Sequence, residues 1–203
     1  AESEGVELPT VFGVARSHGY RTAAFFSKAK FSALQQPGTL DYSQARGGWW
    51  GRWSSDRTVR DVETHLASAA PNMLFVHFSD PDRAGHSDGW MSPAYGNAVA
   101  RTDAAVARVL EAADESFGTG NYAVIVTADH GGHDRGHGSD DPLDVTIPWI
   151  AWGEGVAKHG ALEPSEVRTM DTAATVLWLL GLAAQSDWLG EAVTQAYQPA
   201  LHT

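Results

Sequence analysis

Short apolar runs alternate with amphipathic stretches along most of the 203-residue chain. Runs rich in aromatic and β-branched residues are typical of buried strands, and three of them lie at 20–26, 72–78 and 122–126. Apolar positions at helical spacing, bounded by capping or breaking residues, predict helices over 9–18, 54–70 and 93–116. This alternation predicts one α/β domain over 1–203, a three-layer sandwich with a mostly parallel sheet and helices on both faces.

The helix predicted from Pro93 to about Ser116 has a clear start signal. Ser92 can cap it, and proline is favoured at the first helical position. Its inward face is expected to hold Val99, Val106, Val109 and Leu110. Its outward face is expected to hold mostly Arg101, Asp103, Arg108 and Glu111.

The segment 28–53 departs from the alternation of strands and helices. It contains Pro37, several glycines, and the three tryptophans Trp49, Trp50 and Trp53. We expect an excursion over the sheet edge, in which the tryptophans pack the segment down or line the mouth of a substrate site.

Aspartates and histidines follow two of the predicted strands directly. The loop 127–138 (TADHGGHDRGHG) comes after strand 122–126, and the loop 79–89 (SDPDRAGHSDG) comes after strand 72–78. In open α/β sheets, sites form beyond the carboxyl ends of the strands. Asp82 and His86 stand four residues apart, so one turn of chain, bent at Gly85, can aim both side chains at one ion. Aspartate and histidine together are ligands suited to zinc or a similar divalent metal.

These residues carry a family resemblance. Asp82-x-x-Gly85-His86, Ala128-Asp129-His130-Gly131 and His137-Gly138 resemble the metal-binding signature of the alkaline phosphatase superfamily, type I phosphodiesterase/nucleotide pyrophosphatase branch. The resemblance implies two divalent ions, zinc first and manganese as the alternative, at the carboxyl ends of a central sheet. It implies one ion held by Asp82, His86 and His137, and another held by Asp129 and His130. It further implies a strand over 146–153 and a closing helix over 168–182.

Two ligand assignments remain open. His133 lies in the same loop as His137, which we favour because its following glycine and its distance to the next strand match the family pattern; His133 then becomes an outer hydrogen-bond donor or a substrate contact. Asp80 competes with Asp82, which we favour for its spacing to His86.

Other polar residues are given no direct part in the site. Four further aspartates are expected on the loop surface: Asp134, Asp140, Asp141 and Asp144. His77 is interpreted as a hydrogen-bonded core residue. Four histidines lack acidic partners at ligand spacing: His18, His65, His159 and His202.

The family's nucleophile, a Thr or Ser, and one further metal-binding Asp lie near its N-terminus, ahead of the residues matched here. The chain from Ala1 shows no such segment, and Thr10, which follows Pro9, is a weak candidate. We therefore expect the fold to be incomplete and the nucleophile to lie upstream of residue 1. A sheet without its central strand would expose backbone edges, which favours self-association.

The resemblance implies a metal-dependent hydrolase of phosphate mono- or diesters, acting by two-metal in-line displacement on a small-molecule substrate. A phosphomutase of the same superfamily and a non-catalytic metal-binding remnant are the alternatives. The family also favours a periplasmic or secreted location over a cytoplasmic one.

The composition of the chain limits its possible partners and metal ligands. The net charge of −11, with no basic stripe to offset it, argues against a nucleic acid polymer as a partner. The absence of cysteine leaves aspartate, histidine and other oxygen donors as metal ligands. No apolar run approaches the length needed to span a membrane.

Overall fold

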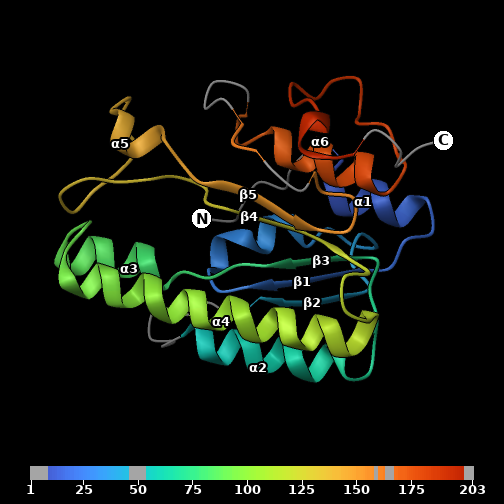
Figure 1. The fold of residues 1–203 in the computed structure, drawn as a ribbon, viewed down its shortest axis with the longest axis horizontal. Coiled ribbons are helices and arrows are strands. Elements are labelled where there is room, and N and C mark those ends of the chain that lie inside the picture. The colour runs from blue at the N-terminus through green and yellow to red at the C-terminus, as the bar shows by residue number, and fades with distance from the viewer. Residues whose placement is uncertain (1–8, 46–53, 158–159, 163–166, 199–203) are drawn as a thin grey trace.

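The computed structural model describes residues 9–45, 54–157, 160–162 and 167–198. The helices are α1 (Val11–Ser17), α2 (Ser55–Leu66), α3 (Asp80–Asp88), α4 (Pro93–Phe117), α5 (Pro142–Val145) and α6 (Asp171–Leu179), with 3-10 helices η1 (Ala29–Leu34) and η3 (Thr194–Ala196). The strands are β1 (Thr22–Phe26), β2 (Tyr42–Ala45), β3 (Met73–Val76), β4 (Ala123–Thr127) and β5 (Trp149–Gly153). The helices and strands expected from the apolar pattern are all present (Figure 1).

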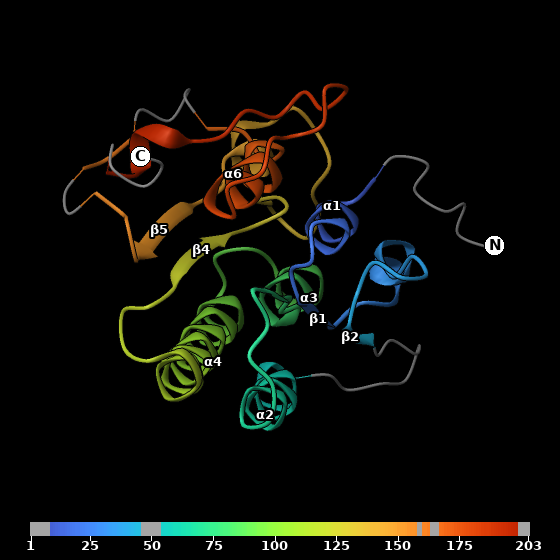
Figure 2. The ribbon, with the colours of Figure 1, turned by 90° about the vertical axis from the view of Figure 1, so that its right-hand side faces the viewer.

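A three-stranded parallel sheet in the order β2-β1-β3 forms the middle layer. Its central strand β1 is buried along its whole length, and successive side chains point to opposite faces. Ala24 and Phe26 join a core with α1 and the end of α6, whereas Ala23 and Phe25 join a core with α2 and α4. These helix pairs lie on opposite sides of the sheet (Figure 2), so the three-layer α/β architecture is confirmed.

The expected parallel pairing is confirmed for β2-β1-β3, whereas β4 and β5 form a separate antiparallel pair. The connection between them contains only the four-residue α5. Without a crossover helix to return the chain to the start of the sheet, the chain reverses and pairs antiparallel. β4 is also less buried than its apolar sequence predicts, since Ala123 and Thr127 are exposed. Within the described residues, β3 pairs only with β1, and β4 only with β5.

Helix α4 buries three alanines at seven-residue spacing, Ala98, Ala105 and Ala112. Of the residues predicted to face inward, Val109 packs with Ala112 against the α2 core, whereas Val99 is 42% exposed. Small side chains let the helices approach closely. Arg108, predicted to face outward, instead donates hydrogen bonds to α2: to the carboxylate of Glu63 at 2.8 and 2.9 Å and to that of Asp56 at 2.6 Å.

The segment 28–53 contributes η1 and the edge strand β2, which the sequence pattern did not predict. Asp41 anchors this segment, because its carboxylate accepts a hydrogen bond from the backbone N–H of Thr22 at 2.9 Å and pairs with Arg16 at 3.0 Å. The three tryptophans of this segment lie outside the described residues. None of the described helices combines the length and the apolar character needed to cross a membrane.

Candidate metal centre

Helix α3 carries the first two predicted ligands, where the sequence suggested a loop bent at Gly85. Proline in the first turn is compatible with a helix start, and Asp82 and His86, four residues apart, lie on one helix face. Gly85 has a different role from the one expected. A β-carbon at this position would lie 2.6 Å from the ring of Trp90, so glycine is required for close packing rather than for a bend.

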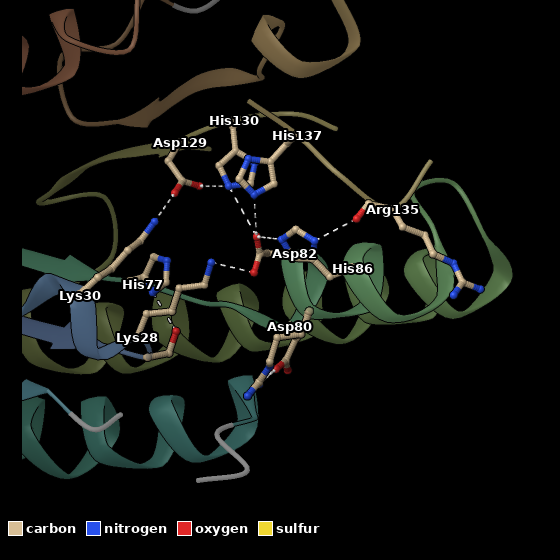
Figure 3. A network of polar contacts seen from close by, with 12 residues as sticks. Lys28, Lys30, His77, Asp80, Asp82, His86, Asp129, His130, Arg135 and His137 are labelled. Carbon is tan, nitrogen blue, oxygen red and sulfur yellow. Dashed lines mark hydrogen bonds and ion pairs between the residues drawn. The ribbon is translucent and has the colours of Figure 1, made fainter. Parts of the chain in front are cut away.

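One carboxylate oxygen faces three imidazoles (Figure 3). Asp82 Oδ1 lies 3.6 Å from His86 Nε2, 3.5 Å from His130 Nε2 and 3.7 Å from His137 Nε2. The rings of His130 and His137 stack at 3.6 Å between centroids, only 14° from parallel. Asp82 Oδ1 and His130 Nε2 are both buried without a hydrogen-bond partner. Four polar atoms therefore converge without bonding to one another.

Backbone carbonyls determine which ring nitrogen faces this cluster. His86 Nδ1 lies 3.0 Å from the carbonyl oxygen of Arg135, and His130 Nδ1 lies 2.8 Å from that of Gly131. Because a carbonyl oxygen only accepts, each Nδ1 carries the hydrogen of the neutral ring and each Nε2 presents a lone pair. Lone pairs facing the carboxylate of Asp82 repel it, so the arrangement suits a bound cation.

The spacing also fits a divalent ion. Asp82, His130 and His137 form the one group of three ligand residues found in the described part of the chain, with ligand atoms within 4.8 Å of one another. A tetrahedral ion with bonds of about 2.0–2.1 Å separates neighbouring ligand atoms by roughly 3.3 Å. The observed 3.5 and 3.7 Å lie within a few tenths of that value. Burial, and then the adjacent His130, lowers the pKa of His137, which favours a neutral, ligating ring.

Asp129 and two lysines complete the cluster. Asp129 Oδ1 lies 3.7 Å from His130 Nε2, so His130 stands between both predicted ion positions rather than with Asp129 alone. Lys30 Nζ lies 3.5 Å from Asp129 Oδ2, and Lys28 Nζ lies 2.7 Å from Asp82 Oδ2. Burial would raise the pKa of Asp129, but His130 and Lys30 together lower it. All five predicted ligands thus lie together, while a second ion remains a prediction.

The sequence analysis missed Lys28 and Lys30, although a usable signal was present. Both follow strand β1 directly, at the same edge where Asp82 and Asp129 follow β3 and β4. Basic residues that follow a strand at this edge are therefore site candidates just as the acidic ones are.

Asp80, the alternative to Asp82, serves a different helix. Its carboxylate accepts hydrogen bonds from the backbone N–H and the hydroxyl of Ser55, at 2.8 and 2.9 Å, and pairs with Arg83. Asp80 therefore caps the start of α2. Thr10 is also a capping residue: its hydroxyl accepts from the N–H of Gly13 at 3.2 Å, and the residue is buried.

His133, the alternative to His137, forms a pair with Asp144 outside the three-ligand group. Asp144, predicted on the loop surface, is only 3% exposed. It accepts hydrogen bonds from the N–H and hydroxyl of Ser139 at 2.9 and 2.7 Å and lies 2.8 Å from His133 Nδ1. The Ser139 N–H and then His133 hold the pKa of Asp144 well below its usual range, and Asp144 raises the pKa of His133.

His77 makes the hydrogen bond expected of it, with Nδ1 2.8 Å from the hydroxyl oxygen of Ser27. Burial lowers its pKa to about 4, so the ring is neutral near pH 7. It lies just beyond β3, beside Lys28 and Lys30 (Figure 3). His77 is therefore nearer to the metal cluster than its interpretation as a core residue implied.

The fold and site define an α/β protein in which carboxylate and imidazole side chains suited to a divalent metal gather beyond the ends of its strands. Residues 4–144, more than half of the chain, match the sequence profile of the type I phosphodiesterase / nucleotide pyrophosphatase family. The chain belongs to that family.

Two curated enzymes are similar to the chain over three quarters or more of its length. The chain is 31% identical over 194 residues to GPI ethanolamine phosphate transferase 1 of Neurospora crassa, covering 76% of this chain and 19% of that protein. It is 28% identical over 197 residues to steryl-sulfatase of Rattus norvegicus, covering 86% of this chain and 33% of that protein. The chain thus spans a third or less of the length of these relatives.

Solved structures share the fold. A phosphoglycerate mutase of Leishmania mexicana, solved at low cobalt concentration, matches with a TM-score of 0.62 at 20% identity, over 89% of this chain and 38% of that one. A protein of the alkaline phosphatase superfamily from Vibrio parahaemolyticus matches with a TM-score of 0.55 at 18% identity, over 91% and 50%.

Proposed function

We propose that the protein containing this chain is a divalent-metal-dependent hydrolase of small-molecule phosphate mono- or diesters. The observation that carries the proposal is the convergence of the Asp82 carboxylate with the Nε2 atoms of His86, His130 and His137. Such a set costs free energy while empty and is stabilised by a cation. Zinc matches the ligand types best, with manganese as the alternative.

A second ion is proposed at Asp129, with His130 near both positions. Bound divalent ions at this edge would supply charge to activate a nucleophilic hydroxyl and to neutralise phosphate oxygens.

The chain's own lysines would hold the substrate anion. Lys28 and Lys30 place two ammonium groups beside the ligand carboxylates, in a protein whose net charge of −11 repels phosphate. A metal ion on Asp82 would compete with Lys28 for that carboxylate. The freed ammonium would then be available to a phosphate oxygen.

The test is hydrolysis of 4-nitrophenyl phosphate and of its bis ester, by the 203-residue chain and by the product of its complete reading frame. Zinc-dependent turnover by the complete product, lost on Asp82→Asn, supports the proposal. Turnover that survives both metal removal and Asp82→Asn contradicts it.

The same preparation separates the alternatives. A phosphomutase would transfer phosphate within a phosphorylated sugar or glycerate, with manganese preferred, and would release no inorganic phosphate. A metal-binding remnant would bind zinc without turning over either substrate. The fold shared with a phosphoglycerate mutase keeps the first alternative open.

Two further expectations belong to this proposal. The partner is a small-molecule phosphate ester rather than a nucleic acid polymer, in keeping with the acidic net charge. A periplasmic or secreted location is proposed from the family resemblance.

A further inference from the structure

Trp90 lies between the two segments that carry the metal ligands. Its indole packs on Gly85 of α3 and on Gly132 of the loop after β4. A β-carbon on Gly85 would lie 2.6 Å from the indole, and one on Gly132 would lie 2.2 Å from it. Both distances are far below a carbon–carbon contact, so neither glycine can be replaced while the indole stays in place.

The same ring also contacts two of the proposed ligands. Its centroid lies 5.1 Å from that of His86, at 88°, and 5.8 Å from that of His137, at 68°. Both are edge-to-face arrangements of the kind that stabilise aromatic pairs. One indole thus touches a ligand on α3 and a ligand on the loop.

The backbone around Trp90 also contacts the ligand loop. The Trp90 N–H donates to the carbonyl oxygen of Asp134 at 2.7 Å, joining it to the ligand loop. Met91, which follows, has a φ of 63° although it is not glycine, and its side chain is 87% exposed. A left-handed conformation costs a bulky residue free energy, so the surrounding contacts must impose it.

We propose that Trp90 is a positioning residue of the metal centre: its indole sets the separation between the α3 ligands, Asp82 and His86, and the loop ligands, His130 and His137. This rests on the proposed metal-binding function. The need for such a spacer follows from the site itself, because lone pairs and a carboxylate repel one another before an ion is bound. An apolar wedge seated on two glycines keeps the ligand atoms at coordination distance without competing for the ion.

The experiment compares the wild-type chain with Trp90→Ala, Trp90→Phe, Gly132→Ala and the control Trp152→Ala, a half-exposed tryptophan on β5. Zinc affinity is measured by calorimetry, and cobalt(II) coordination by its visible absorption bands. Trp90→Ala and Gly132→Ala should weaken zinc binding by about 10- to 100-fold, as loss of supporting contacts does at other metal sites, and should alter the cobalt bands. Trp90→Phe should retain most of the affinity, and Trp152→Ala should match the wild type.

A measurement on the metal-free protein tests the spacing role of Trp90 separately from the proposed metal-dependent function. The loop is closed by paired hydrogen bonds between His133 and Gly136, at 2.9 and 3.1 Å. Amide exchange at these residues should accelerate in metal-free Trp90→Ala but not in Trp152→Ala. Unchanged exchange together with unchanged zinc affinity overturns the role of Trp90. A wild-type chain that binds no metal overturns the proposed function, while faster exchange in Trp90→Ala would still support the spacing role.

Discussion

Asp80 and Asp82 stand two residues apart on helix α3 and serve different parts of the molecule. Asp80 accepts hydrogen bonds from Ser55 at the start of α2, whereas Asp82 faces the imidazoles of the metal cluster. One carboxylate has its hydrogen bonds satisfied, and the other has a buried oxygen without a partner. Substituting Asp80 and substituting Asp82 should therefore change different properties of the protein.

Replacing Asp80 should affect stability, and replacing Asp82 should affect metal binding. Asp80→Ala removes the acceptor at the start of α2 and should lower the free energy of unfolding by about 1–2 kcal/mol, with zinc affinity changed only a few-fold. Asp82→Asn should abolish tight zinc binding without lowering the melting temperature of the metal-free chain. Denaturation and calorimetry on both variants check this, and an exchange of the two phenotypes would show that the assignment is reversed.

Lys28 should oppose metal binding when no anion is present and support it when one is. Its ammonium lies 2.7 Å from Asp82 Oδ2, so Lys28→Met removes a competitor and should raise zinc affinity a few-fold in phosphate-free buffer. Inorganic phosphate should tighten zinc binding to the wild type but not to Lys28→Met. Arg101→Met, on the exposed face of α4, is the control. Equal phosphate effects in all three proteins would remove Lys28 from the anion site.

The His133–Asp144 pair should make stability depend on pH. The pKa of His133 is raised above its ordinary 6.5, so its contribution is complete below that pH and is lost as pH rises through the raised value. The pKa of Asp144 is lowered from its ordinary 3.8, so its contribution is lost only in stronger acid. The melting-temperature difference between wild type and His133→Gln should thus be largest between these two ordinary values and shrink above neutral pH. A difference that grows with rising pH contradicts the ion pair.

The strand edges of β3 and β4 should promote self-association of the 203-residue chain. Each of these strands has a single partner within the described residues. The backbone N–H and C=O groups on its other edge can therefore pair with a strand of a second chain. Light scattering after size exclusion should show dimers or larger species, despite the net charge of −11. A monodisperse monomer at all concentrations would show that these edges are already covered.

The helices, two strands of the central sheet and the ligand set could be predicted because they depend on local sequence pattern. Periodicity located β1, β3 and the helices on both faces, and the family signature brought out Asp82, His86 and the loop histidines. The parallel expectation failed at β4 and β5, because strand pairing depends on how the chain returns, and α5 is too short to make a crossover.

Features that depend on distant contacts could not be predicted. The apolar pattern of α4 does not reveal that Val99 is exposed while Ala98 beside it is buried. Asp144 resembles its exposed neighbours in sequence, yet it is buried and accepts hydrogen bonds from Ser139 and His133, residues whose proximity the sequence does not reveal. Gly85 suggested a bend, since nothing in sequence reveals that Trp90 will pack against it.

Calorimetric titration of zinc into the chelator-stripped chain tests the central claim most directly. The wild type should show one tight site, formed with Asp82, His130 and His137, and at most one much weaker site near Asp129. The double variant His130→Ala/His137→Ala should lose the tight site, and zinc should raise the melting temperature of the wild type only. Zinc binding by the wild type no stronger than that of the double variant would contradict the metal centre and the function proposed from it.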